Sequence, residues 1–365
     1  LRTLGFRLIF AVIYVLLSTS LLTGFLIKNP KSLHRMLKIT GNYFLGIFLY
    51  TLVIILLADF GRILLKYVFH ASWIHSRTAF TVTGAICALL ILLLSACGIF
   101  HAKYIKTTSY DVIINKTIPE RTSMKVVLLA DTHFGYNAGV LHARELVRKI
   151  NKQKPDLVCI AGDIFDNEYD AIRNPEKLEK TLRGIKSTYG VYACWGNHDL
   201  NEEILAGFTF KHKDGDLSDI KDPRMKKFLE DSNIHILEDE SVLINDQFYV
   251  IGRKDASLTE KIHETRKAPA QLTEKLDRDK PIIMIDHQPK ELQELADAGV
   301  DLDLCGHTHN GQTFPGNFTI KLMWENPCGL LSKDNMTNIT TSGAVSGGRQ
   351  CVSALTVKSV LLIFN

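Results

Sequence analysis

The sequence predicts an α/β layered domain that is preceded by a membrane-spanning helical region. Long uncharged stretches are confined to residues 1–106, and short apolar runs alternate with amphipathic stretches from residue 107 onward. Apolar runs of about four to eight residues between turn signals are typical of buried strands, and their alternation with helices is typical of an α/β fold. We therefore expect a transmembrane region over residues 1–106 and a second domain over residues 107–365.

Three stretches of the N-terminal region are long enough to cross a bilayer as helices. They cover residues 8–27, 39–58 and 78–100 and carry no charged residue, and a bilayer core needs about 20 such residues. The first stretch lacks the short apolar region and the cleavage site of a signal peptide. We expect about three spanning helices and an integral membrane protein. The first residue is Leu1, which leaves open a natural start further upstream, with another helix.

Charge is distributed unevenly along the chain. Residues 1–106 hold 11 Lys or Arg and one acid, Asp59, whereas the remainder is net acidic. The basic residues divide almost equally between the two sides of the three stretches, so the positive-inside rule does not fix the orientation. Most of the seven cysteines lie in apolar runs, and unpaired thiols favour a reducing compartment. We therefore expect the second domain on the cytoplasmic face. The chain has no basic arm of the kind that binds nucleic acid.

In the second domain, the predicted elements follow the order β-α-β-α-β and then become mostly β. Residues 101–123 are expected to form a linker and an entry strand. The predicted strands cover 126–130, 156–161, 190–195, 234–237, 242–244, 248–251, 282–285, 302–305 and 360–364, and the predicted helices cover 141–151, 175–186 and 291–298. In the first of these helices, the apolar residues lie on one side at helical spacing, as is typical of an amphipathic helix. They are Leu141, Leu146, Val147 and Ile150.

Five short motifs follow predicted strands and share Asp, His or Asn. They are Asp131-Thr-His133, Gly162-Asp163, Gly196-Asn197-His198-Asp199, Asp286-His287 and Gly306-His307-Thr-His309. A rigid strand fixes the position of such a motif and a short loop aims its side chains, while glycine permits tight turns and close approach of the backbone. Each motif alone is explained equally well as a turn, a cap or a solvated loop. The ordered set predicts one shared metal site.

The residue types predict a site for two divalent cations. Oxygen and nitrogen donors without sulfur suit Mn²⁺, Fe or Zn²⁺, and the carboxylate of Asp163 could bridge two ions. Two adjacent cations lower the pKa of a shared water and clamp phosphate oxygens, which predicts attack by metal-bound hydroxide on a phosphate ester. His198 is the candidate acid for the leaving oxygen, and Asp166 is the candidate partner that holds its tautomer.

The five motifs resemble those of the calcineurin-like metallophosphoesterase superfamily, D-x-H, G-D, G-N-H-D/E, H and G-H-x-H, and the resemblance covers residues 107–365. Residues 306–312, Pro315 and Ser342-Gly343 are similar to the membrane-anchored bacterial branch, which implies a bacterial cell membrane. The resemblance implies a four-layer αββα sandwich. It implies a first metal held by Asp131, His133, Asp163 and His309, a second held by Asp163, Asn197, His287 and His307, and the roles already given to His198 and Asp166.

The chain departs from the pattern of this family at three places. No arginine follows Asp199, unlike in the protein-phosphatase branch, which argues against a phosphoprotein substrate. Asn310 stands where similar chains often have glycine, and residues 343–351 are less regular than the tail of the family.

Three functions remain open at the level of sequence. The expected one is hydrolysis of a phosphate ester or pyrophosphate bond in a lipid or lipid-linked substrate, because a tethered site meets lipid headgroups at high effective concentration. One alternative is a phosphodiesterase or phosphatase for soluble metabolites that is merely anchored, and another is a non-catalytic metal-binding sensor module. A candidate basic clamp for the substrate consists of Lys211, Lys213, Arg253 and Lys254.

Overall fold

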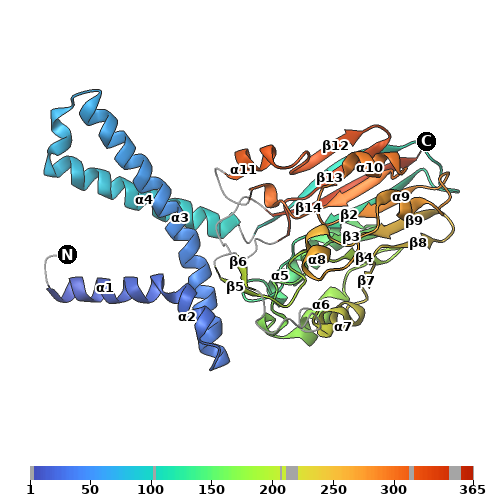
Figure 1. Ribbon diagram of the computed structural model, residues 1–365, viewed down its shortest axis with the longest axis horizontal. Helices are drawn as coiled ribbons and strands as arrows, with labels where there is room; N and C mark the ends of the chain where they lie inside the picture. Colours follow the sequence, from blue (N-terminus) through green and yellow to red (C-terminus); the bar gives the residue numbers. More distant parts are fainter. Residues whose placement is uncertain are drawn as a thin grey trace. The chain divides into compact units, whose positions relative to one another are not determined.

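The computed structural model describes residues 4–101, 104–205, 208–210, 221–311, 316–344 and 355–364. Within these ranges the chain divides into two compact units, of which the first holds residues 4–101 and the second holds the rest (Figure 1).

The first unit consists of apolar helices. They are α1 (Leu4–Ser18), α2 (Ser20–Leu26), α3 (Lys31–Tyr67), the short helix η1 (Ser72–His75) and α4 (Arg77–His101). By length and composition, α3 and α4 could each cross a membrane, and α1 with α2 would add a third span if this pair, bent by 49°, is one segment. Most of their large apolar side chains are exposed, as is usual for side chains that face lipid. The protein therefore carries two to three candidate membrane spans.

Helix α3 is longer than the apolar stretch at 39–58 from which it was predicted. It extends over 37 residues because the flanking residues, among them Lys31 and Lys66, are good helix formers. The hydropathy of the sequence therefore predicts the apolar middle of this helix, but it does not predict where the helix begins and ends.

The second unit contains two six-stranded sheets and a small two-stranded sheet. The first sheet has the order β1-β14-β2-β3-β4-β7 and the second has the order β12-β13-β11-β10-β9-β8. The strands are β1 (Ile105–Ile114), β2 (Ser123–Leu129), β3 (Leu157–Ala161), β4 (Val191–Cys194), β5 (Glu203–Leu205), β6 (Phe208–Phe210), β7 (His235–Ile236), β8 (Glu240–Ile244), β9 (Phe248–Gly252), β10 (Ile282–Ile285), β11 (Leu302–Cys305), β12 (Gly329–Lys333), β13 (Met336–Thr340) and β14 (Leu355–Phe364).

Helices cover the outer face of each large sheet (Figure 1). Those on the first sheet are α5 (Val140–Gln153), α6 (Pro175–Leu182) and α7 (Pro223–Asp231), and those on the second are α9 (Pro269–Thr273) and α10 (Leu292–Asp297). The other helices of this unit are α8 (Ala256–Lys261) and α11 (Gly316–Thr319), with the short helices η2 (Tyr169–Ala171), η3 (His309–Gly311) and η4 (Ile320–Leu322).

Three hydrophobic cores separate these layers. One lies between the first sheet and α5, α6 and α7, where Leu146, Leu178 and Phe228 pack on the strands. A second lies between the two sheets and includes Leu128 and Ile285. A third lies between the second sheet and helices α9 and α10. The second unit is thus the expected four-layer αββα sandwich, preceded in the chain by long apolar helices.

The sequence analysis overlooked helix α7. Its buried residues Met225, Phe228 and Leu229 have helical spacing, and Asp222 caps it by accepting a hydrogen bond from the backbone N–H of Arg224. The signal was therefore present in the sequence as an Asp-Pro start followed by an apolar face.

The parallel strands direct their carboxyl ends toward one edge of the sandwich. β2, β3 and β4 are parallel in the first sheet, and β9, β10, β11 and β13 are parallel in the second. All five predicted motifs follow strands of these two groups. In open α/β sheets this edge is where ligands usually bind.

Candidate metal centre

All seven expected metal ligands meet at this edge of the sandwich. Three groups of three residues each place one donor atom per residue within 4.8 Å of one another. Two of them consist of expected ligands, Asp131, His133 and His309 in one group and Asp163, His287 and His307 in the other, and the third joins His133 to Asp166 and His198. The seventh ligand, Asn197, approaches the second group, since its Oδ1 lies 3.1 Å from Nε2 of His287.

The carboxylate of Asp163 lies between the two groups. Its Oδ2 is 3.3 Å from Nε2 of His287 and 3.8 Å from Nε2 of His133, so one oxygen faces an imidazole of each group. Its Oδ1 accepts a hydrogen bond of 2.8 Å from the backbone N–H of His198. This is the position that a bridging ligand would need.

Five of the seven expected ligands have a backbone in the left-handed region. The φ angles of Asp131, His133, Asp163, His307 and His309 lie between 38° and 70°. For non-glycine residues this conformation is disfavoured by roughly 1–2 kcal/mol each. Such strain clusters where function requires it. Here it turns the chain sharply at the strand ends, so that side chains from different loops converge.

Close backbone packing holds these loops together. A Cβ on Gly162 would lie 2.6 Å from Nδ1 of His287, and a Cβ on Gly196 would lie 2.2 Å from Oδ1 of Asp163. Only glycine fits at such distances, so the expectation of close approach at these positions is confirmed. Nδ1 of His287 also lies 2.8 Å from the carbonyl oxygen of Ala161. As the donor in that bond, Nδ1 carries the proton and leaves Nε2 with a free lone pair.

The cluster is buried and fits a pair of metal ions. Asp131, His133, Asp163 and His287 are each no more than 2% exposed. Among the described residues, Nδ1 of His309 has no hydrogen-bond partner although it is buried. A buried polar atom without a partner costs about 1–3 kcal/mol, and a metal ion would satisfy it. The donors are carboxylate, amide and imidazole groups, which suit Mn²⁺, Fe or Zn²⁺.

Burial and neighbouring charges shift the pKa values of the two buried carboxyl groups in opposite directions. It raises the pKa of Asp131 to about 7, against the lowering effect of the imidazole of His287. Burial alone would also raise the pKa of Asp163, but the charges of His287 and His198 outweigh it and hold this pKa well below its usual value. A carboxylate that stays ionised when buried is a strong cation ligand, so Asp163 is the electrostatic focus of the centre.

The hydrogen-bond partner of His198 differs from the expected one. Nδ1 of His198 donates to Oδ1 of Asn167, whereas Asp166 lies beside His133, with Oδ1 at 3.6 Å from Nδ1 of that ring. Asn167 has a φ of 61°, and this left-handed turn carries its side chain, rather than that of Asp166, into hydrogen-bond contact with His198. The role expected of Asp166, holding the tautomer of the His198 ring, therefore falls to Asn167.

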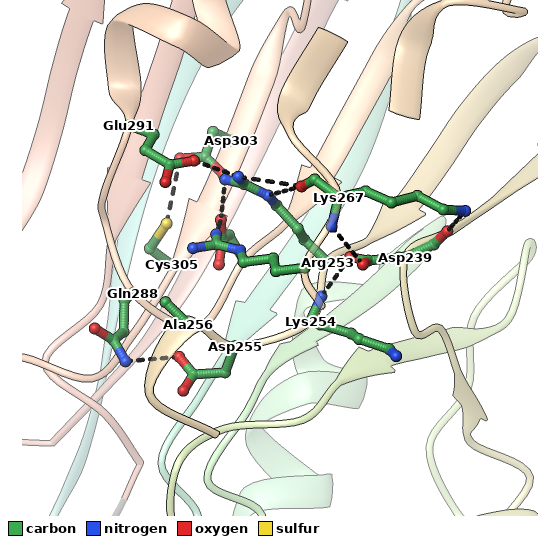
Figure 2. Close-up of polar contacts among 12 residues, drawn as sticks. Asp239, Arg253, Lys254, Asp255, Ala256, Lys267, Gln288, Glu291, Asp303 and Cys305 are labelled. Carbon is green, nitrogen blue, oxygen red and sulfur yellow. Dashed lines mark hydrogen bonds and ion pairs between the residues drawn. The ribbon is translucent and has the colours of Figure 1, made fainter. Parts of the chain in front are cut away.

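A buried charge network supports the loop that carries His287 (Figure 2). Oδ2 of Asp286 accepts hydrogen bonds of 3.1 Å from Arg253 and 2.6 Å from Arg266. Arg253 also pairs with Glu291, and the exposed fraction of its side chain is only 1%. Backbone bonds join the same loop to β11, because the N–H of Gly306 donates to the carbonyl oxygen of His287 at 3.0 Å. The position of His287 therefore depends on ion pairs within the second sheet layer.

The expected basic clamp is wrong for Arg253. This side chain is enclosed in the network just described and cannot reach a substrate. Lys254 pairs with Glu264 at 2.7 Å. Other residues of the predicted clamp and of the family motifs lie outside the described residues. They are Lys211, Lys213, Gln312, Pro315 and residues 345–351.

Two residues beside the centre were not singled out from the sequence. The ring of Trp324 is 5.1 Å from that of His307, and Nζ of the exposed Lys290 lies 5.3 Å from the Trp324 ring. Trp324 is 15 residues beyond the last motif, and no spacing rule connects the two. Lys290 closely follows Asp286-His287, and this proximity in sequence could have indicated that it lies near the centre.

The chain is similar to known phosphoesterases. The model of the family described as calcineurin-like phosphoesterase matches residues 124–311, just over half of the chain. An uncharacterized metallophosphoesterase of Campylobacter jejuni is 31% identical over 61% of this chain and 54% of that protein. A transmembrane protein with metallophosphoesterase domain from Bos taurus is 27% identical over 66% of this chain and 52% of that protein.

A third relative carries a more specific name. UDP-2,3-diacylglucosamine pyrophosphatase LpxG of Chlamydia trachomatis is 22% identical over 54% of this chain and 68% of that protein. The chain spans about half the length of the metallophosphoesterases of Helicobacter pylori and Campylobacter jejuni that it matches, at 54% of each.

Replacing Gly196 should damage the metal centre without touching a ligand. In Gly196→Ala the new Cβ would displace Asp163, so we expect metal affinity to fall roughly 10- to 100-fold, as when a group that positions a ligand is lost. Metal titration of the purified protein measures this. Gly139→Ala is the control, because nothing lies within 4 Å of a Cβ there. Equal affinity in both variants would contradict the packing argument.

Removing Arg253 should destabilise the second unit. Breaking a buried ion pair costs about 3 kcal/mol or more, which for a unit of this size lowers the apparent melting temperature by roughly 6–12 °C. We expect this for Arg253→Met, and the matched control is Arg148→Met, whose partner Glu145 is at the surface. Thermal unfolding in detergent compares them. The network would have no supporting role if both variants melted like the parent protein.

Proposed function

Because this chain belongs to the calcineurin-like phosphoesterase family, we propose that it hydrolyses a phosphate ester or pyrophosphate bond of a lipid or lipid-linked substrate at the membrane surface. The family and the Asp and His clusters identify the protein as a metal-dependent phosphoesterase with candidate membrane spans and a candidate two-metal site.

The short connection between the last candidate span and the second unit supports a membrane substrate. Helix α4 ends at His101 and strand β1 begins at Ile105. Four peptide steps reach at most about 14 Å, so the start of the second unit stays within that distance of the end of α4. Tethering at this range raises the effective concentration of membrane substrates without any new contact.

The similarity to LpxG supports the same class of substrate. The name of that relative states a diacylated sugar nucleotide and a pyrophosphatase activity. A substrate of that kind has a lipid part that stays in the bilayer and a phosphate part that reaches a tethered site. At 22% identity this similarity suggests the substrate class but not the individual molecule.

The residues divide into two sets of metal ligands and one candidate acid. We assign Asp131, His133, Asp163 and His309 to one ion and Asp163, Asn197, His287 and His307 to the other. Two bound cations would neutralise phosphate charge and make a water acidic enough to ionise near neutral pH.

His198 is the candidate acid that protonates the leaving oxygen. Its Nδ1 donates to Asn167, which leaves Nε2 as the atom that exchanges a proton. Burial lowers the pKa of His198 and Asp163 opposes that shift. An anionic phosphate in the site would add to the opposing effect and favour the protonated ring.

Lys290 and Trp324 are the candidate contacts for the rest of the substrate. Lys290 is exposed and its Nζ stands over the ring of Trp324, which itself contacts His307. A cation beside an aromatic face suits a second phosphate attached to a sugar or a lipid headgroup.

We also propose the cytoplasmic face for the second unit. Cys159, Cys194 and Cys305 are free thiols, as in a reducing compartment. Labelling of an engineered cysteine in whole cells with a membrane-impermeant reagent tests this assignment.

Hydrolysis by the purified full-length protein tests the proposed function. We would compare a lipid pyrophosphate in mixed micelles, a soluble aryl phosphodiester and a soluble aryl phosphomonoester, each with Mn²⁺ and with chelator. We expect chelator-sensitive turnover with the highest kcat/KM on the lipid. Higher kcat/KM on the soluble esters would favour an anchored enzyme for soluble metabolites. Two bound metals with no hydrolysis of any ester would point to a sensor module.

Two substitutions should separate metal binding from acid catalysis. We expect Asp163→Asn to lose bound metal and to lower activity by orders of magnitude, because the bridging charge is removed. We expect His198→Ala to keep its metal and to lose roughly 10²- to 10⁴-fold in turnover, with the smallest loss on substrates that have good leaving groups. Metal analysis and kcat measurements decide between these outcomes. Equal metal loss in both variants would mean that His198 is a ligand.

A further inference from the structure

An exposed apolar segment lies in the second unit between the last ligand motif and strand β12. It covers Gly316–Trp324, including α11 and η4, and we call it the rim segment. The exposed fractions are 62% for Phe318, 88% for Leu322 and 75% for Met323. Single exposed apolar residues are normal on protein surfaces. Three within six residues form a patch of the kind that marks an interaction site.

The rim segment is joined to the metal centre. Trp324, at its end, contacts the ring of His307 at 5.1 Å between centroids. Just beyond it, the carbonyl oxygen of Pro327 accepts a hydrogen bond from Thr308, which stands between two expected ligands. Whatever binds the exposed side chains of the rim segment is therefore held next to the phosphate site.

The register of the first sheet places the entry of the chain at the same edge. Ile105, the first residue of β1, pairs with Leu355 of β14. Three residues further along β14, Lys358 pairs with Leu128, which is three residues before the expected ligand Asp131. Strand β1 runs parallel to β14 and β14 runs antiparallel to β2. The second unit therefore receives the chain from the last candidate span at the edge that carries the metal ligands.

The position of the rim segment favours a lipid bilayer as its binding partner. The chain reaches Ile105 only four residues after the end of α4, an apolar helix long enough to span a bilayer. Ile105, which stands at the ligand edge, therefore stays within about 14 Å of the end of α4, because the connection is four peptide steps long. An apolar patch at this edge has lipid within reach, and its Lys321 is suited to anionic headgroups.

We propose that the rim segment docks into the headgroup and acyl boundary of the membrane. Leu322, Met323 and Phe318 enter the apolar layer, and Lys321 meets lipid phosphates. The metal centre then opens onto the membrane surface, where a lipid phosphate needs no transfer through water. This last consequence rests on the proposed function, whereas docking itself does not.

Photo-crosslinking tests the docking directly. The full-length protein would be placed in nanodiscs of phosphatidylethanolamine and phosphatidylglycerol, with benzoylphenylalanine replacing Leu322. The matched control replaces Ile113, which is 62% exposed and lies on β1 eight residues beyond Ile105. At about 3.3 Å per residue it is roughly 26 Å from the ligand edge. Mass spectrometry counts lipid adducts at each position.

We expect at least about tenfold more lipid adducts at position 322 than at position 113, since the apolar layer is reached only from the ligand edge. Equal yields at the two positions would overturn the proposal. So would adducts at position 322 to a second copy of the chain or to another segment of the same chain, because the rim segment would then be covered by protein.

A kinetic experiment distinguishes failure of docking from failure of the proposed function. In Leu322→Ser/Met323→Ser we expect KM for a lipid pyrophosphate in nanodiscs to rise roughly tenfold, while turnover of a soluble aryl phosphodiester stays unchanged, since a surface substitution does not alter the metal centre. Lipid adducts without lipid hydrolysis by the parent protein would support docking and reject the lipid substrate. Lipid hydrolysis without adducts would reject docking and leave the substrate intact.

Discussion

The structure depends on bringing buried carboxylates and imidazoles to one point. Asp131 and Asp163 are almost fully enclosed, and an ionised carboxylate is expensive to bury unless cations or donors surround it. The parallel strands of two sheets end at one edge, tight turns aim the side chains, and glycines at positions such as Gly196 let the loops approach. The convergence of ligands is therefore a property of the whole sandwich and not of any one motif.

The half of the centre that comes from the second sheet requires its own support. His287 follows Asp286, whose charge is balanced by Arg253 and Arg266 inside the protein. Burying such a group adds little net stability, because desolvation offsets the attraction between the charges. The effect of this ion-pair network is on geometry. Buried charged groups have no water to replace their partners, so the side chains have few alternative arrangements. The network therefore fixes the loop that must meet the ligands of the first sheet.

The sequence predicts best what metal chemistry constrains most. Asp163 and His307 were singled out because few residue types can bind divalent cations. Strands such as β3 were predicted because they are short apolar runs that end just before a motif. Asn167 was missed because its contact with His198 depends on a left-handed turn that spacing does not encode. Arg253 was assigned to a substrate clamp because burial of a charged residue cannot be deduced from composition. Trp324 reaches the site through tertiary packing alone.

The membrane connection and the metal centre share one geometric cause. A strand entering antiparallel to β2 must begin where β2 ends, and β2 ends at Asp131. An entry strand of this kind therefore connects the ligand edge, and not the opposite edge, to the preceding helix. An exposed apolar segment at that edge would reduce the solubility of a free enzyme. Beside a membrane the same segment would contribute binding energy, which is the physical basis of the proposed docking.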